Sequence, residues 1–227
     1  MKHDEAISAA LANRRFMYAY LWRAFAADPD KAFLDSVCSD TTLAECALFM
    51  GEDSQGMREQ DLLANFVRAT PDVLDTVKRD YTKLFIGPAK LPAPPWESVY
   101  VTGEDLLFQV STLEVRQAFH RAGYQATGYP HEADDHLATE LGFMETLAKK
   151  TLDAYEDDDS EQVKLLLSHQ VRFLSEHLNA WLPQFVERLL SSDKPKVSDF
   201  YHRFAVIARD VCTADLTALE EIAAALA

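Results

Sequence analysis

Glycine and cysteine are scarce in this 227-residue sequence, which has 7 glycines and 3 cysteines. The shortage of glycine argues against a glycine-rich phosphate-binding loop and against an all-β fold with many tight turns. The cysteines, Cys38, Cys46 and Cys212, are odd in number and form no C-x-x-C pair. They therefore predict neither a disulfide framework nor a thiolate metal site, and we interpret them as small buried apolar side chains.

Long apolar runs and an excess of positive charge are also missing. No stretch has the uninterrupted apolar length of a membrane span, and Asp4 and Glu5 interrupt the N-terminal region where a secretory signal would be basic and then apolar. The chain has 37 acidic and 22 basic residues, which gives a net charge of −15. This charge repels a phosphate backbone and attracts cationic partners. We therefore expect a cytoplasmic protein without stable membrane insertion and without a nucleic-acid partner.

Apolar residues recur at helical spacing along most of the chain. The stripes predict helices over about residues 4–27, 30–38, 41–50, a segment ending near 69, 70–85, 111–122, 135–153 and 163–181, with further helices after Pro183 and Pro195. No internal repeat is present, and no linker is long enough to divide the chain. The expected fold class is all-α, a single-domain bundle of about ten helices with short connections.

Three helix starts carry specific sequence signals. Thr70-Pro71 is typical of an N-cap followed by proline at the first helical position. Ser111 and Glu114 have the spacing of a capping box, which places the start of that helix at Ser111. Pro183 is expected to begin a short helix after the 163–181 stripe.

The segment from about 87 to 110 is the one long irregular connection that the sequence predicts. It holds four prolines in eight residues, so neither a helix nor a central strand can run through it. Trp96 and Tyr100 follow beside Glu97, and aromatic side chains on a stiff loop offer binding area at low ordering cost. An alternative remains open, in which Trp96 anchors the loop in the core. A long loop between two helical halves can also act as a hinge, which predicts a monomer or a domain-swapped dimer.

The acidic segment HEADDH and the helix after it suggest a site. Asp134 and Asp135 are placed to begin that helix, where the macrodipole favours carboxylates. His136 and Glu140 lie four residues apart, a spacing that suits metal ligation, so a metal-dependent hydrolase is one alternative. The signal is weak, because no second histidine-rich helix supplies further ligands. His169 and His177 flank a leucine stripe and are interpreted as core or surface histidines.

Four segments in order, YTKLFIGP, PPWESVY, STLEVR and EADDHLATELGFM, resemble the signatures of the TorD/DmsD family of redox-enzyme maturation chaperones. The resemblance covers about residues 81–147. It implies an all-helical cytoplasmic protein, with no cofactor and no enzymatic activity, that binds the twin-arginine signal peptide of a molybdenum-cofactor oxidoreductase before export. The family's acidic motif usually has proline where this chain has Ala133, which puts the geometry of that turn in question.

The implied peptide-binding residues come from three of these segments. Carried over by position, and with Glu97 added as a further acid, they are Tyr81, Leu84, Phe85, Pro88, Pro95, Trp96, Glu97, Tyr100, Glu132, Asp134, Asp135 and His136. Acids beside an apolar groove suit a peptide that has two guanidinium groups followed by an apolar segment. For His136, a binding role, a helix-capping role and pairing with Asp135 all remain open.

The resemblance also implies the partners. They are the signal peptide and the apo-form of the molybdoenzyme catalytic subunit, together with cofactor-biosynthesis and translocase proteins. The alternative within the same superfamily is an adaptor for a non-exported molybdoenzyme subunit, which would bind the N-terminal region of a mature enzyme that lacks Arg-Arg.

Overall fold

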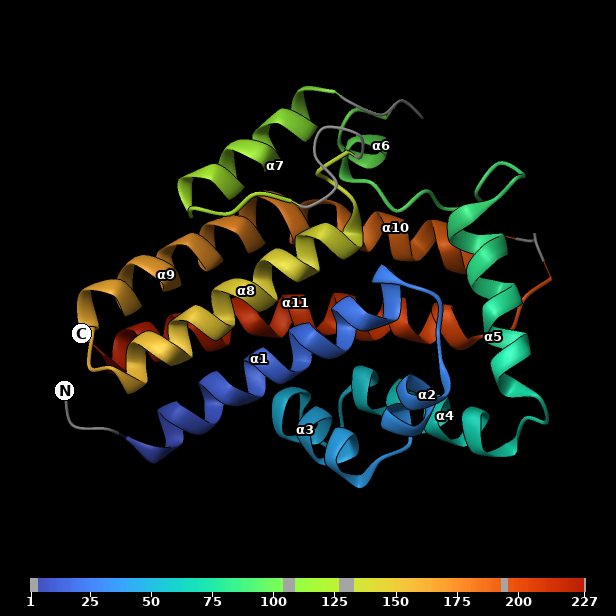
Figure 1. The fold of residues 1–227 in the computed structure, drawn as a ribbon, viewed down its shortest axis with the longest axis horizontal. Helices are drawn as coiled ribbons and strands as arrows, with labels where there is room; N and C mark the ends of the chain where they lie inside the picture. Colours follow the sequence, from blue (N-terminus) through green and yellow to red (C-terminus); the bar gives the residue numbers. More distant parts are fainter. Residues whose placement is uncertain (1–3, 104–108, 127–132, 193–195, 227) are drawn as a thin grey trace.

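The computed structural model describes residues 4–103, 109–126, 133–192 and 196–226. These residues form α-helices joined by short connections, with two π-helical segments, η1 and η2 (Figure 1). The elements are α1 (Glu5–Ala26), α2 (Lys31–Val37), α3 (Asp40–Met50), α4 (Gln55–Ala69), α5 (Val73–Tyr81), η1 (Thr82–Ile86), α6 (Glu97–Val101), α7 (Val110–Arg121), α8 (Leu137–Glu156), α9 (Ser160–Phe173), η2 (Leu174–Leu178), α10 (Asn179–Ser191) and α11 (Phe200–Ala225). The predicted all-α bundle of about ten helices is confirmed.

Polar side chains cap the first turns of several of these helices. Asp4, Asp30, Ser39 and Ser54 each accept a hydrogen bond from a backbone amide in the first turn of the helix that follows. Asp159, within an acidic run at residues 156–161, does the same for α9. That run therefore forms the turn between α8 and α9 as well as contributing charge.

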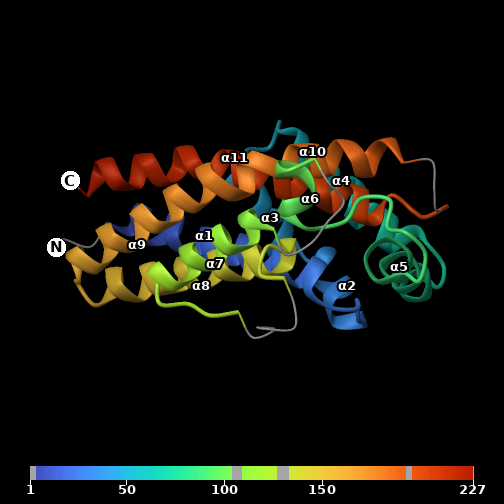
Figure 2. The ribbon, with the colours of Figure 1, turned by 90° about the horizontal axis from the view of Figure 1, so that it is seen from above.

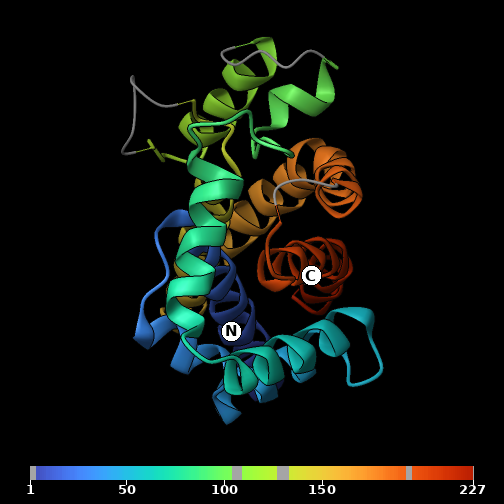
Figure 3. The same ribbon diagram turned by 90° about the vertical axis from the view of Figure 1, so that its right-hand side faces the viewer.

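The long helices run side by side along the molecule, with α6 and α7 on one side of them and α2, α3 and α4 on the other (Figures 1 and 3). α1 packs along α8, and α11 packs against α4 and α10. α5 crosses the long helices and is seen nearly end-on in Figure 2. The start of α1 and the end of α11 lie at the same end of the molecule.

Residues from both sides of the 87–110 segment share one apolar core. Leu21 and Phe25 of α1 belong to the same buried cluster as Leu141 of α8 and Phe204 of α11. Burial of this shared apolar surface is the main favourable term that holds the two halves together. None of the helices in the described part of the chain is long and apolar enough to cross a membrane.

None of the three helix starts with specific signals lies where the sequence predicts it: two are displaced by one or two residues, and the third, at Pro183, is not a helix start. α5 begins at Val73, after Asp72 with φ 48°, so Thr70 and Pro71 lie before the helix. α7 begins at Val110, and no side chain caps it. Ser111 is instead buried within the first turn.

Pro183 does not begin a helix. It lies inside α10, and α9, η2 and α10 follow one another without a break. The π-helical segment directly before α10 shifts the hydrogen-bond pattern just ahead of the proline, which has no amide hydrogen to donate.

The predicted irregular segment also contains one short helix, α6. Before it, the chain from Gly87 to Trp96 has no helical structure, as the prolines predict. The position of α6 is set by contacts with α8 and α10, which are described next.

Candidate functional site

Two motif-bearing segments that are far apart in sequence meet in the structure. Trp96 and His136 form an isolated antiparallel β-bridge. Their rings lie edge to face, with centroids 5.0 Å apart. We call this contact the motif junction and define it as residues 95–100 and 133–137. Three of the four family-like segments therefore border one region, since α7 carries STLEVR and packs against α6.

His136 is the N-cap of α8. Its Nδ1 accepts a hydrogen bond from the amide of Ala138 at 3.1 Å. Burial lowers the pKa of His136 to about 4, although the nearby Asp135 carboxylate acts in the opposite direction. Of the three roles that the sequence leaves open for His136, the helix-capping role is the one for which a contact is observed.

Asp134 and Asp135 precede α8 instead of beginning it, so the predicted helix start is wrong by two residues. Asp134 forms an ion pair with Arg116 of α7. Asp135 is fully buried, and its Oδ2 accepts the amide hydrogen of Ser98 at 2.9 Å. The two acids thus bind α7 and α6 to the start of α8, and Asp135 Oδ1 is buried without a hydrogen-bond partner among the described residues.

Glu97 is also buried, at 2% exposure, and its carboxylate oxygens lie 3.1 and 3.2 Å from Nδ1 of His177 in η2. Nearby, Glu140 Oε2 accepts the indole hydrogen of Trp181 at 3.1 Å. Burial raises the pKa of Glu97 and raises that of Glu140 further, with the Glu97 charge adding to the shift of Glu140. The sequence did not identify His177 and Trp181 as part of this region, because 80 residues separate Glu97 from His177 and no local pattern links them.

Tyr100 fixes α6 to α10. Its ring stacks on Trp181, with centroids 5.5 Å apart, and meets Phe185 edge to face. Arg188 of α10 lies over the Tyr100 ring and donates a hydrogen bond from Nε to the carbonyl of Pro92 at 2.9 Å. The loop therefore packs along α10 on one side and along the start of α8 on the other.

Tyr81, Leu84 and Phe85 lie in the core and contact a different group of residues. Tyr81 donates its hydroxyl hydrogen to the carbonyl of Phe25, and Tyr81 and Phe85 both pack against the ring of Tyr201. Leu84 has 0% exposure. In this conformation Tyr81 and Phe85 pack between α1 and α11.

The predicted binding residues therefore differ in accessibility. Pro88 is exposed, and Trp96, Tyr100 and His136 are partly exposed. The buried ones are Tyr81, Leu84, Phe85, Pro95, Glu97, Asp134 and Asp135. Glu132 lies outside the described residues.

The pair His136 and Glu140 does not form a metal site. Nδ1 of His136 is used in the helix cap and Glu140 bonds to Trp181. Among the residues that the structure describes, no group of three or more histidine, cysteine, aspartate or glutamate side chains is arranged to hold a metal ion. The metal-dependent alternative is thus without a ligand set in this part of the chain.

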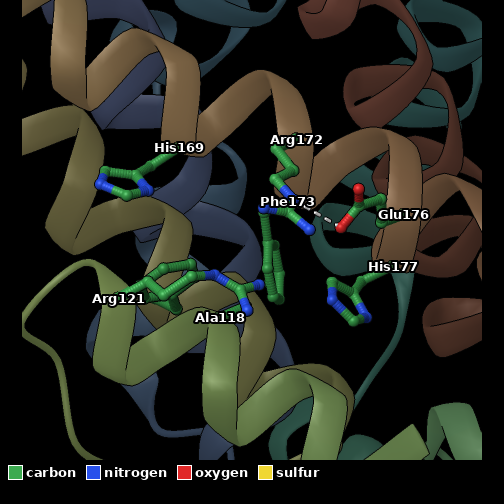
Figure 4. A pocket seen from close by; sticks show the side chains of 8 residues that line it. Ala118, Arg121, His169, Arg172, Phe173, Glu176 and His177 are labelled. Carbon is green, nitrogen blue, oxygen red and sulfur yellow. Dashed lines mark hydrogen bonds and ion pairs between the residues drawn. The ribbon is translucent and has the colours of Figure 1, made fainter.

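Two cavities are lined by residues outside the motif junction. One, between α7 and α9, has a volume of about 10 Å³, and Phe143, Phe173, Arg121 and His169 are among its lining residues (Figure 4). That is room for about one water molecule. The other is a groove of about 440 Å³ between the starts of α4 and α11 and the end of α10.

Sequence relatives agree with the motif pattern. The family model described as nitrate reductase delta subunit matches residues 51–187. The chaperone protein TorD of Vibrio cholerae serotype O1 is 34% identical over 114 residues, which cover 50% of each chain. The probable Tat proofreading chaperone DmsD of Haemophilus influenzae is 33% identical over 133 residues, or 58% of this chain and 56% of the relative. The Tat proofreading chaperone DmsD of Salmonella typhi is 32% identical over 113 residues, or 50% and 48%.

This chain spans about half the length of the curated relatives it matches. A solved structure of a putative redox enzyme maturation protein from Archaeoglobus fulgidus aligns with a TM-score of 0.49 at 17% identity, covering 92% of this chain and 94% of that one. The assignment rests on the sequence matches, since the family model covers more than half of the chain. The chain belongs to the nitrate reductase delta subunit family, and within it to the TorD/DmsD group of redox-enzyme maturation proteins.

Proposed function

We propose that this protein is a cytoplasmic chaperone, not an enzyme, that binds the N-terminal twin-arginine signal peptide of a molybdenum-cofactor oxidoreductase. It holds the apo-form of the catalytic subunit until the cofactor is inserted and export can begin. Relatives named Tat proofreading chaperones support this proposal. The observation that carries it is the Trp96–His136 bridge, which brings two of the family-like segments into one surface region.

The motif junction has the chemistry that such a peptide needs. Trp96 and Tyr100 offer partly exposed aromatic surface for the apolar segment of the signal. The net charge of −15 favours approach of two adjacent arginines. We propose that the partly exposed residues contact the peptide directly and that the buried members of the predicted set, Glu97 and Asp135 among them, hold those residues in place.

Calorimetric titration with a twin-arginine signal peptide from a molybdoenzyme tests this proposal. We expect micromolar or tighter binding, and a loss of about tenfold or more in affinity for Trp96→Ala, since truncating a central aromatic anchor typically costs about 2 kcal/mol or more and about 1.4 kcal/mol is tenfold. Trp22→Ala is the matched control, because Trp22 is 43% exposed on α1 and lies outside the junction. Equal weakening by both substitutions, or tight binding that neither affects, would place the peptide elsewhere.

The second candidate is an adaptor for a non-exported molybdoenzyme subunit, which the nitrate reductase delta subunit match favours. The same titration separates the two functions. An adaptor would bind the N-terminal segment of a mature subunit that lacks Arg-Arg, and it would bind a Lys-Lys version of the signal peptide no more weakly than the Arg-Arg version. The chaperone proposal requires a clear preference for Arg-Arg.

A further inference from the structure

Buried acidic groups hold α6 against the rest of the bundle. Glu97 of α6, Asp135 before α8 and Glu140 of α8 have exposures of 2%, 0% and 0%, and His177 of η2 is 4% exposed. We call these four side chains the carboxyl cluster. Burying ionised carboxylates is costly unless each is paired and hydrogen-bonded, so the charge state of the cluster matters for the position of α6.

The hydrogen bonds of the cluster do not satisfy three ionised carboxylates. His177 forms a hydrogen bond with Glu97. The Trp181 indole donates to one oxygen of Glu140, and the Ser98 amide donates to one oxygen of Asp135. In the part of the chain that the structure describes, Glu140 Oε1 and Asp135 Oδ1 are buried without a hydrogen-bond partner.

Glu97 and Glu140 contact His177 and Trp181, which lie one helical turn apart on the continuous helix formed by η2 and α10, so the two carboxyls face the same buried region. The Glu97 charge adds to the raised pKa of Glu140. A hydrogen bond between two carboxyls requires one proton between them.

The surroundings supply little positive charge. His177 is the basic group in contact with Glu97, and in the described part of the chain no lysine or arginine forms an ion pair with Glu97 or Glu140. From α11, Cys212 lies near Glu140, and burial raises the pKa of its thiol well above the ordinary value, so it stays neutral. Arg116 of α7 is paired with Asp134.

One further cation lies beside α6. It is Arg188 of α10, which lies over the Tyr100 ring and donates a hydrogen bond to the carbonyl of Pro92. On the α8 side, burial keeps the His136 imidazole neutral near pH 7. A proton between Glu97 and Glu140 therefore neutralises one of the two carboxyls and removes their mutual repulsion.

α6 is short and buries little apolar surface of its own. It has only five residues, and of its apolar side chains Val99 is buried while Val101 is 52% exposed. Besides the cluster, it packs against α7, its Glu97 amide bonds to the Asp135 carbonyl at 3.0 Å, and its Tyr100 ring contacts α10. Separation of Glu97 from Glu140 would release the first residue of this short helix.

We propose that a proton shared by Glu97 and Glu140 holds α6 against α8 and α10, and that loss of this proton to solvent releases α6 and uncovers Trp181 and Phe185. The direction of the pH dependence follows from the linkage between proton binding and the closed state. A carboxyl whose pKa is raised in the closed state stabilises that state fully at low pH, and the stabilisation is lost as pH rises through the raised pKa. The closed conformation is therefore favoured in acid and opens toward alkaline pH. This inference does not require the proposed peptide-binding function.

Hydrogen exchange of the whole protein between pH 5.5 and 8.5 tests the proposal. Exchange rates in fragments covering residues 95–101 are divided by the intrinsic rate at each pH, and α11 serves as the internal reference. In the wild-type protein we expect protection of this segment to fall relative to α11, by up to about tenfold per pH unit for release of one proton. In Glu140→Gln, whose amide can keep both hydrogen bonds without ionising, the relative protection should not change with pH.

Glu156→Gln is the matched control, because it makes the same change at an exposed position of α8. It should behave like the wild-type protein. Glu97→Gln removes the second member of the pair and should reduce the pH dependence, although burial alone still raises the pKa of the remaining Glu140. Wild-type protection of residues 95–101 that stays constant relative to α11 overturns the proposal whether or not either variant folds. So does a Glu140→Gln protein that folds and keeps the wild-type pH dependence.

Discussion

At the scale of single residues, burial determines what the polar groups of the motif junction do. His136 and Asp135 are adjacent in sequence, yet their side chains bond in different directions, to the amides of Ala138 and Ser98. Each satisfies a backbone donor that would otherwise be left unpaired at the start of a helix. Both side chains are therefore part of the structure of the junction before any peptide arrives.

The lowered pKa of His136 predicts a specific loss of stability in acid. Because the folded state holds its pKa at about 4, below the ordinary 6.5, the folded state favours the neutral imidazole. The resulting stability is complete above pH 6.5 and is lost as pH falls toward 4. His136→Asn keeps a side-chain cap without titrating. We expect it to lose about 1–2 kcal/mol less than the wild-type protein between pH 7 and pH 5.

Urea unfolding at the two pH values measures this difference. His120→Asn, a change at an exposed histidine of α7, is the control and should follow the wild-type protein. An equal acid loss in the wild-type and His136→Asn proteins would contradict the capping account.

At the scale of helices and loops, a buried polar network connects elements that are distant in sequence. Arg14 of α1 donates from Nη2 to Asp215 of α11 at 2.9 Å and to Gln170 of α9 at 2.7 Å. Tyr18 donates its hydroxyl hydrogen to the same aspartate at 2.7 Å. All four side chains are at most 1% exposed, so the charges compensate each other instead of being solvated.

Removing one charge from this network should cost far more than removing one from the surface. Asp215→Asn leaves a buried guanidinium without its counter-ion, and we expect a loss of about 3–5 kcal/mol in the free energy of unfolding. The double variant with Arg14→Met should recover more than half of that loss. Asp35→Asn, which breaks the exposed Lys31–Asp35 pair, should cost less than about 0.5 kcal/mol. Chemical denaturation compares the three, and a similar loss for Asp215→Asn and Asp35→Asn would refute the role assigned to the network.

The starts of α7 and α8 are not determined by local sequence signals alone. Ser111 has the spacing of a capping box, but α7 begins one residue earlier and Ser111 is buried in its first turn. Asp134 and Asp135 could have begun α8 by their chemistry, but each is bound by a residue of another helix. Tertiary contacts from α6 and α7 thus decide these starts, and a single sequence does not contain that information in a local pattern.

At the scale of the whole molecule, periodicity was enough to predict the fold class and most of the helices, because apolar stripes report burial directly. The proline-rich segment was also recognisable, since proline restricts the backbone wherever it occurs. The burial of the predicted site residues was not predictable. Which of two chemically suitable groups faces solvent depends on partners such as His177 and Trp181, and these come from a different third of the chain.

The central claim is that the exposed edge of the motif junction receives the signal peptide. Photo-crosslinking tests it most directly, using a twin-arginine signal peptide with a photoreactive residue in its apolar segment and mass spectrometry to locate the adducts on the full chain. If the peptide binds there, we expect adducts concentrated at Trp96, Tyr100 and His136. These adducts should be lost when an unlabelled Arg-Arg peptide competes. Adducts concentrated instead at the groove beside Gln55, Lys196 and His202 would contradict it.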